Sequence, residues 1–288
     1  MRILVTGSSG YIGSKVIPKL LDLGHEVMYT SRSDSVRKFS WYDDKSNINL
    51  DFSKLQDFDF QAIGNVDLLI DLAWGHLDDF RSEKHISEEL FYHYDFIKNM
   101  ILAGVKDIVV LGTCLEYGLL EGELYENMLA NPVIEYAIAK DSLRRFIESY
   151  NKNHEFSFKW IRLFYNYSYT EDKIKPNSIL DQLSKAIKNG ETTFNMSKGD
   201  QLRDYLDIDE VVDYIVKLSL QKKILGIINC SSGKAISVNS LVENYVHNNN
   251  ITINLNRGYY SYSEYEPFSF WGNNDKLNEI LNKNESKD

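Results

Sequence analysis

The sequence predicts an α/β protein: a doubly wound parallel sheet followed by a smaller C-terminal α/β unit. Three observations lead to this fold class. A glycine-rich turn directly follows a short apolar run at residues 3–5, and strand-like and helical segments alternate up to about residue 164. Beyond that point the chain has amphipathic helices, short strands and a C-terminus rich in Tyr and Asn. Parallel strands need crossover connections, and helices supply them on both faces of a sheet.

The N-terminal segment reads as strand, glycine turn, helix and strand. Apolar residues recur at helical spacing from Ile12 to Leu23, and Gly24 is a candidate helix C-cap. Residues 25–30 then form a second strand. Together these elements predict a βαβ unit.

The alternation continues along the chain. Further strands are expected at 67–72, 107–111 and 156–164. Helices are expected at about 85–103, 132–150, 177–189 and 207–220. No Pro/Gly/Ser linker separates the two parts of the chain, so we expect the second unit to pack tightly against the first.

Composition excludes several classes of protein. The 288 residues are 43% hydrophobic and 26% charged, which is typical of an ordinary globular chain, and the net charge of −10 argues against a nucleic-acid partner. Cys114 and Cys230 are far apart and the six histidines are scattered, so we expect neither a disulfide framework nor a metal site. No run approaches the roughly 18 apolar residues of a membrane span, and no signal peptide is evident; we therefore expect no membrane partner and a cytoplasmic location.

Three glycines mark a candidate dinucleotide site. Gly7, Gly10 and Gly13 stand between the first strand and the first helix, where glycine allows a tight turn and the close approach of a diphosphate. The start of the helix also presents free N–H groups and a positive dipole end to an anion. Tyr11 and Ile12, from the same turn, are expected among the cofactor contacts.

The end of the second strand favours NADP(H) over NAD(H). Sites that take NAD usually carry an acidic side chain there, which accepts the ribose 2′-hydroxyl. This chain has Ser31 and Arg32 instead, and a cation beside small hydroxyls suits a 2′-phosphate. NAD(H) stays the alternative, because Asp34 would reach the ribose if the strand ended later.

Tyr136 and Lys140 form an i, i+4 pair on one face of a predicted helix. An adjacent cation lowers the pKa of a phenol, so this tyrosine is a candidate for proton transfer near neutral pH. Thr113 lies at the end of a predicted strand, and strand ends line the ligand crevice in such sheets. We expect Thr113 and Tyr136 to share a substrate oxygen.

These motifs together resemble the extended short-chain dehydrogenases/reductases of the NAD-dependent epimerase/dehydratase family, which act on nucleotide sugars. The resemblance covers most of the chain. It implies an NAD(P)-binding Rossmann domain at 1–165, with a returning segment near 204–232, and a nucleotide-sugar-binding domain at 166–203 and 233–288. It also implies a homodimer, with core and subunit interface supplied by the aromatic stripe Phe91, Tyr92, Tyr94 and Phe96.

The resemblance assigns roles to further residues. Asp51 matches the family's adenine contact, Lys140 the residue that holds the nicotinamide ribose, and Arg203 the residue that contacts the diphosphate of the sugar nucleotide. Besides the glycine turn, the implied cofactor contacts are Ser31, Arg32, Asp51, Phe52, Leu72, Ala73, Trp74 and Lys140. The implied substrate contacts are Thr113, Cys114, Tyr136, Asn166 and Arg203.

Departures from the family pattern narrow the reaction. The 4,6-dehydratases place an acid directly after the catalytic threonine, whereas this chain has Cys114 and Leu115, so we do not expect dehydration. Residues 112–118 are instead similar to sugar 4-ketoreductases of the CDP-abequose and CDP-paratose synthase type. Glu116 is either an additional acid or a structural hydrogen-bond partner.

Two asparagines of the family are also changed. In our alignment Glu89 replaces the one in the helix after the fourth strand. The one after the Arg-Leu-Phe strand is either shifted to Asn166 or replaced by Tyr165.

The resemblance implies an enzyme that reduces the C4 keto group of a nucleoside-diphosphate 4-keto-6-deoxy-sugar for surface polysaccharide, with Tyr136 as proton donor. One alternative is a UDP-sugar 4-epimerase, which uses the same residues with a tightly held NAD. Another is a catalytically silent dinucleotide sensor. The presence of both Tyr136 and Lys140 disfavours the sensor.

Overall fold

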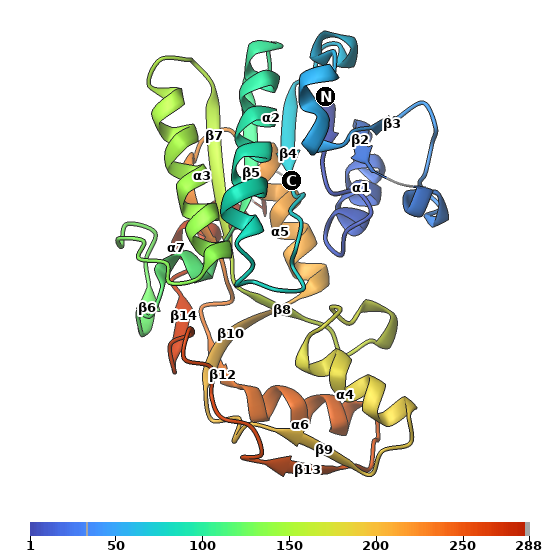
Figure 1. Cartoon of the computed structure of the whole chain (residues 1–288), viewed down its shortest axis with the longest axis vertical. Helices are drawn as coiled ribbons and strands as arrows, with labels where there is room; N and C mark the ends of the chain where they lie inside the picture. The colour runs from blue at the N-terminus through green and yellow to red at the C-terminus, as the bar shows by residue number, and fades with distance from the viewer. Residues whose placement is uncertain (33, 286–288) are drawn as a thin grey trace.

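The computed structural model describes residues 1–32 and 34–285, which form two units (Figure 1). The larger unit is built on a seven-stranded sheet of order β11-β7-β5-β4-β1-β2-β3, in which all neighbours are parallel. Its strands are β1 (Arg2–Val5), β2 (Glu26–Ser31), β3 (Asn47–Asn49), β4 (Leu68–Asp71), β5 (Asp107–Thr113), β7 (Ser157–Leu163) and β11 (Gly226–Cys230). The predicted doubly wound parallel sheet is confirmed.

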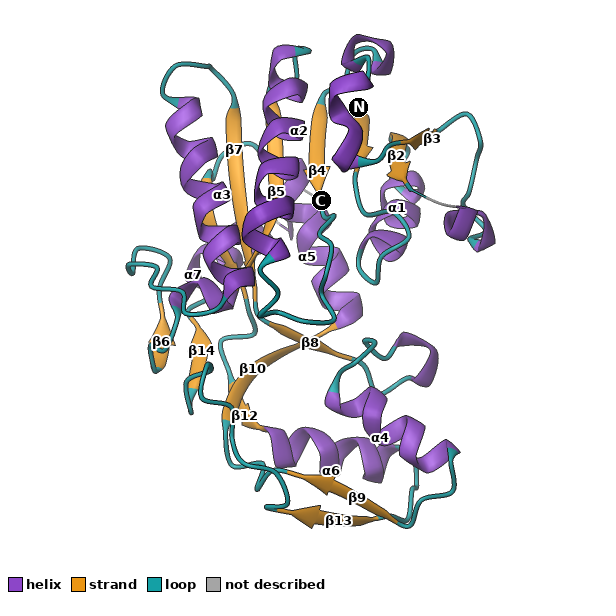
Figure 2. Cartoon of the chain, in the orientation of Figure 1, coloured by secondary structure: helices purple, strands orange, loops and turns teal. Residues whose placement is uncertain are grey.

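Helices cover both faces of this sheet (Figure 2). On one face lie α1 (Gly13–Asp22), α5 (Ile208–Leu220) and α7 (Asp275–Glu285); on the other lie α2 (Leu90–Leu102) and α3 (Glu135–Asn151). Successive strand residues alternate between the two layers: Ile3 and Val5 of β1 belong to the first core, and Leu4 belongs to the second. Because both faces are covered, the central strands β1, β4 and β5 are largely apolar.

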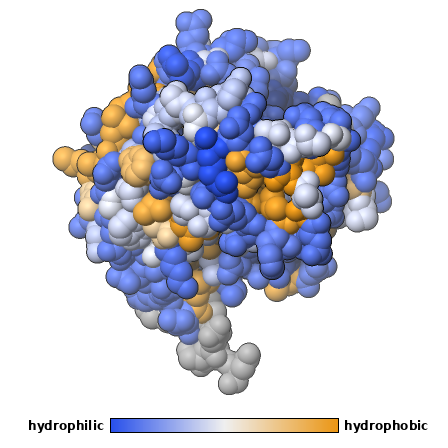
Figure 3. Space-filling view, turned by 90° about the horizontal axis from the view of Figure 1, so that it is seen from below, coloured by the Kyte–Doolittle hydropathy of each residue, from blue (hydrophilic) through white to orange (hydrophobic). Residues whose placement is uncertain are grey.

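The smaller unit combines short strands with two helices. One sheet holds β8 (Tyr165–Tyr167), β10 (Leu202–Asp207) and β12 (Ala235–Ser237), and another holds β9 (Thr193–Met196) and β13 (Asn254–Arg257). Their apolar side chains form a separate core with α4 (Ile179–Lys188) and α6 (Val238–Asn248). A strand pair, β6 (Gly122–Leu124) with β14 (Phe270–Gly272), lies beside it. Seen from this end, the surface is mostly hydrophilic with patches of hydrophobic residues (Figure 3).

Two elements differ from the predicted ones. Helix α3 begins at Glu135 rather than Pro132, because Ile134 at the N-cap is still extended. Helix α7 packs against α5 and β11 of the larger unit, and its Leu277 and Ile280 are buried in the core of that unit. The family resemblance instead predicts that residues 233–288 belong to the smaller unit.

The predicted aromatic stripe does not form one face. Phe96 is buried in the core, Tyr92 lines the pocket described below, and Phe91 is 51% exposed. Tyr94 packs edge-on against Phe146 of α3, with ring centroids 5.6 Å apart. Positions separated by one or two residues point in different directions on a helix, so these side chains have different surroundings. The homodimer stays a prediction.

Within residues 1–32 and 34–285, the length and apolar character that a membrane-crossing helix needs do not occur together in any helix.

Candidate active site

A cavity of about 710 Å³ opens at the carboxyl ends of β1 and β4. Between these two strands the order of the sheet reverses, since the chain continues from β1 outward to β2 and β3 and later returns to β4 on the other side. Ligands of open α/β sheets bind at such a point. The cavity is lined by the glycine turn, by the ends of β2, β4 and β5, by α3, and by the loop that precedes α4 in the smaller unit.

The glycine turn forms one side of the cavity and has no room for side chains. Gly7 has a φ of +70°, and a Cβ there would lie 2.8 Å from the Ala73 nitrogen. A Cβ at Gly13 would overlap the Gly7 carbonyl oxygen. The backbone around the first turn of α1 is therefore bare, which fits a dinucleotide diphosphate.

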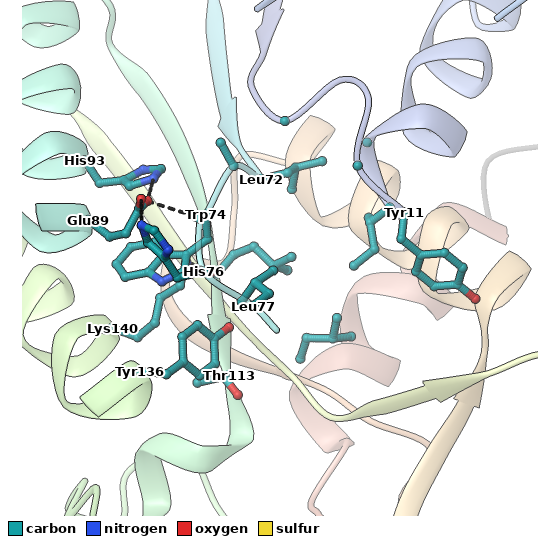
Figure 4. Close-up of a pocket in the computed structure, with 18 of the residues that line it drawn as sticks. Tyr11, Leu72, Trp74, His76, Leu77, Glu89, His93, Thr113, Tyr136 and Lys140 are labelled. Carbon is teal, nitrogen blue, oxygen red and sulfur yellow. Dashed lines mark hydrogen bonds and ion pairs between the residues drawn. The ribbon is translucent and has the colours of Figure 1, made fainter. Parts of the chain in front are cut away.

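Tyr11 connects this turn to the smaller unit. Its hydroxyl donates a hydrogen bond of 2.6 Å to the carbonyl oxygen of Lys173. Figure 4 shows Tyr11 across the cavity from Thr113, Tyr136 and Lys140. Gly10, Ile12 and Gly13 also line the cavity, so the whole predicted motif faces it.

At the end of β2, Arg32 and Ser31 both line the cavity. Asp34, the residue that could have supported NAD, is exposed and accepts a hydrogen bond of 2.8 Å from the Arg37 guanidinium. Asp34 does not line the main cavity but borders a smaller, adjoining one with Arg32 and Arg37.

Asp51 and Phe52 line the cavity beyond Arg32. The Asp51 carboxylate accepts hydrogen bonds from the Ser53 hydroxyl and backbone nitrogen, which lower its pKa. The Phe52 ring stacks on Phe96, with centroids 4.4 Å apart. The lining also includes the predicted residues Leu72, Ala73 and Trp74.

Thr113, Tyr136 and Lys140 lie together on the opposite wall (Figure 4). The Lys140 ammonium donates a hydrogen bond of 2.8 Å to the Leu111 carbonyl oxygen and lies 3.8 Å from the centre of the Trp74 ring system. The ring of Tyr136 stacks on Phe80, with centroids 5.0 Å apart. The end of β5 and the first turns of α3 thus bring the three predicted catalytic side chains to one place.

The pKa of Tyr136 departs from our expectation. Burial raises its pKa above the ordinary value, the nearby Glu116 carboxylate raises it further, and the interaction with the Thr113 hydroxyl only partly opposes this. The predicted lowering by Lys140 is not found. Before ligands bind, Tyr136 is therefore a protonated phenol, which is the form that gives a proton to a substrate.

Burial lowers the pKa of Lys140 to about 8. The side chain is 3% exposed, so removal from water disfavours its charged form. The carboxylates of Asp71 and Glu116 oppose the shift. At neutral pH the ammonium is still charged.

Glu116 is a structural residue. It is fully buried, lies outside the cavity lining, and accepts hydrogen bonds from the Thr113 nitrogen, the Trp160 indole and the Arg162 guanidinium. Together with the Thr113 side chain it forms a capping box at the start of η5 (Cys114–Tyr117). Of its two predicted roles, the hydrogen-bonding one fits, and it fixes Thr113 in place.

A buried network behind Trp74 was not anticipated. His93 of α2 bonds Asp71 at the end of β4 at 2.8 Å and stacks on Trp74 with centroids 4.7 Å apart. Glu89 lies 3.6 Å from the other His93 nitrogen and accepts a hydrogen bond from the Gly75 nitrogen. Asp71 and His93 are far apart in sequence, so only the sheet-to-helix packing could have indicated the pair.

Contacts within this network shift the pKa values of Glu89 and His93. Burial acts to raise the pKa of Glu89, but the hydrogen bonds from His93 and from the Gly75 nitrogen lower it to about 2. Burial acts to lower the pKa of His93, but the Asp71 and Glu89 carboxylates raise it. Figure 4 shows Glu89 between His93 and His76 on the wall that also carries Lys140.

At the substrate end, Cys114 and Asn166 line the cavity. Burial raises the pKa of the Cys114 thiol, so it stays protonated and unreactive, as a packing residue. The Asn166 side-chain oxygen is buried and, among the described residues, accepts no hydrogen bond. Such an acceptor needs a donor, and a ligand hydroxyl would supply one.

Arg203 lies outside the cavity lining. Its guanidinium pairs with Glu266 at 2.9 Å and donates to the carbonyl oxygens of Leu202 and Phe268. The guanidinium carbon lies 5.9 Å from the centre of the ring of Tyr165, which lines the cavity, and the charge interacts electrostatically with Cys114. Its contact with the diphosphate stays a prediction.

A known protein family matches most of this chain. The model of the NAD dependent epimerase/dehydratase family matches residues 3–231. The chain belongs to this family. The resemblance inferred from the motifs is thereby confirmed, and with it a nicotinamide-dinucleotide-dependent enzyme.

Two curated relatives carry related activities. The dTDP-6-deoxy-L-talose 4-dehydrogenase (NAD(+)) of Aggregatibacter actinomycetemcomitans is 30% identical over 274 residues, which is 94% of this chain and 99% of the relative. The CDP-abequose synthase of Yersinia pseudotuberculosis is 25% identical over 218 residues, covering 75% of this chain and 72% of the relative.

Among solved structures, the UDP-glucuronic acid 4-epimerase of Bacillus cereus, in complex with UDP-glucuronic acid and NAD, superposes with a TM-score of 0.82. The match covers 98% of this chain and 93% of the epimerase at 20% sequence identity. It shows that the fold is shared.

Proposed function

We propose that this family member reduces the C4 keto group of a nucleoside-diphosphate 4-keto-6-deoxy-sugar. The observation that carries the proposal is the wall formed by Thr113, Tyr136 and Lys140 at the switch point of the sheet, without a second acid in the lining beside Thr113. A relative that matches nearly the full chain is named a 4-dehydrogenase of a dTDP-6-deoxy sugar. Oxidation and reduction at C4 are the two directions of one reaction.

Tyr136, Thr113 and Lys140 have separate roles in the proposed reduction. The dinucleotide, when bound, supplies the hydride. Tyr136 hydrogen-bonds to the ketone oxygen and gives its phenolic proton to that oxygen as negative charge develops, and Thr113 hydrogen-bonds to the same oxygen. Lys140 holds positive charge beside the resulting phenolate, which then recovers a proton from solvent. The ketone thus gains one hydride and one proton and becomes a secondary alcohol.

Substituting Tyr136→Phe tests this assignment. The variant keeps the ring that stacks on Phe80 but lacks the proton, so we expect turnover to fall by about 100-fold or more with dinucleotide affinity unchanged. The assay follows oxidation of NADPH or NADH at 340 nm with dTDP-4-keto-6-deoxyhexose as substrate. Full activity in this variant would remove Tyr136 from the mechanism.

We further propose that the cofactor is NADP(H). Support comes from Arg32, which lines the cavity at the end of β2, and from Asp34, which is paired with Arg37 instead. The relative named above carries NAD(+) in its name, so NAD(H) is the competing outcome.

Titration with both dinucleotides decides between them. We expect NADPH to bind at least about tenfold more tightly than NADH, about 1.4 kcal/mol, and Arg32→Ala to remove the difference while leaving the affinity for NADH unchanged. Preferential binding of NADH by the original protein, or tightly bound NAD that remains through purification, would contradict the NADP(H) proposal.

A further inference from the structure

One cation at the substrate end of the cavity has no assigned role. Lys175 lies in the loop between η6 (Glu171–Lys173) and α4, and it lines the cavity from the smaller unit. Within residues 1–32 and 34–285, its ammonium has no hydrogen-bond or ion-pair partner. The side chain is half-buried without a carboxylate beside it, and this burial lowers its pKa.

The other lysines of the same segment are paired. Lys173 bonds the Asp209 carboxylate, Lys185 lies 2.7 Å from Asp181, and Lys188 pairs with Glu171. Lys175 differs from them both in facing the cavity and in lacking a carboxylate. A cation kept this way is stabilised when a ligand brings an anion to it.

The remaining cations near the cavity are already engaged or lie elsewhere. The Arg203 guanidinium is held by Glu266 and two carbonyl oxygens, outside the lining. Lys140 bonds the Leu111 carbonyl oxygen beneath Trp74, and Arg32 lies at the cofactor end with Asp51. Among the described residues that line the substrate end, Lys175 is thus a cation without a carboxylate partner.

The chemistry of the substrate says which charge arrives there. With C4 of the sugar at Thr113 and Tyr136, C1 lies on the opposite side of the ring and directs its diphosphate away from these residues. Cys114 directly follows Thr113, and its thiol is near enough to the Lys175 ammonium for the two to interact electrostatically. Lys175 therefore lines the same end of the cavity as the predicted substrate residue Cys114, and it does so from the smaller unit.

We propose that Lys175 binds the diphosphate of the nucleotide sugar. This inference rests on the proposed function, since it takes the position of C4 from it. It gives the diphosphate a cationic partner from the smaller unit, in addition to the contact that the family resemblance assigns to Arg203, whose guanidinium is already paired with Glu266. A lysine at this place makes substrate affinity depend on the phosphates of the ligand and not on its base.

Binding measurements with Lys175→Gln, Lys175→Arg and the control Lys185→Gln test the inference. The control removes one positive charge from the same segment but from a side chain that is 62% exposed and outside the lining. Dissociation constants are measured by calorimetry for dTDP, for thymidine and for the dinucleotide, and kinetic constants are measured with dTDP-4-keto-6-deoxyhexose.

We expect Lys175→Gln to weaken dTDP binding at least tenfold and to raise KM by a similar factor, with kcat, dinucleotide affinity and thymidine affinity unchanged. Lys175→Arg keeps most of the affinity, and Lys185→Gln matches the original protein. Unchanged dTDP affinity in Lys175→Gln would overturn the inference, and so would an equal loss for thymidine. The proposed function fails separately, if the original protein binds dTDP but reduces no 4-keto sugar.

Discussion

At the scale of single residues, Tyr136 and Lys140 are both protonated near neutral pH, as the proposed reduction requires. Burial raises the pKa of Tyr136 above its ordinary value and lowers that of Lys140 to about 8. Near neutral pH the phenol therefore keeps its proton and the amine keeps its charge. The lysine is the group whose charge changes first as the pH rises.

This order of ionisation predicts the alkaline limb of the pH profile. Because Lys140 is charged below about pH 8 and neutral above it, kcat/KM for the dinucleotide should be constant from pH 6.5 to 7.5 and fall as the pH rises through about 8. This constant reports ionisations of the free enzyme, so it is the appropriate readout. A profile that stays flat up to pH 9.5 would show that the charge on Lys140 is not used.

The sequence indicated the candidate catalytic residues but not the residues that support them. The spacing of Tyr136 and Lys140, with Thr113 at a strand end, sufficed to place three side chains on one wall. The structural role of Glu116 depends on Trp160 and Arg162 of β7, which lie far along the chain and pair with β5 only in the folded sheet. No local pattern indicates such partners.

At the scale of elements, the buried network joins β4, α2 and the loop that follows β4. The Thr6 hydroxyl donates to Asp71 and accepts from the nitrogens of Leu72 and Ala73, while Asp71 also bonds His93. These contacts hold the strand end against the glycine turn. They keep two buried carboxylates paired with one imidazole.

Removing the imidazole should therefore be costly. We expect His93→Leu to lower the free energy of unfolding by about 3–5 kcal/mol, because it leaves Asp71 and Glu89 buried without their partner. Glu88→Gln, at a half-buried neighbour on the same helix segment that contacts neither Asp71 nor His93, should change it by less than about 0.5 kcal/mol. Urea unfolding at pH 7 measures both, and equal stabilities for the two variants would contradict the role of the network.

The elements also show where sequence patterns lose information. Helical spacing located α2 and α3. The start of α3 could not be located in this way, because it depends on Ile134 being extended and on the Tyr136 nitrogen donating a hydrogen bond to the Phe80 carbonyl oxygen. His93 is a structural residue of the buried network, and no sequence pattern could have named its partners Asp71 and Glu89.

At the scale of the whole molecule, residues of both units line the main cavity. The alternation of apolar runs and helices predicted the larger unit, because the inner strands of its sheet are buried on both faces. The smaller unit was predicted only as an α/β body. Its pairs β9 with β13 and β6 with β14 join short strands separated by long stretches of chain, and α7 returns to β11. Short strands carry too little periodicity to reveal such partners.

We propose that each turnover transfers one hydride net from the cofactor to C4 of the substrate, rather than returning it to the same sugar. The most direct test supplies dTDP-4-keto-6-deoxyhexose together with dinucleotide deuterated at C4 of the nicotinamide, and follows both the cofactor absorbance and the product by NMR. The account predicts one dinucleotide oxidised per sugar reduced, with one deuterium at C4 of the product. Interconversion of UDP-hexose 4-epimers with no net oxidation of the dinucleotide, and no reduction of the keto sugar, would contradict it.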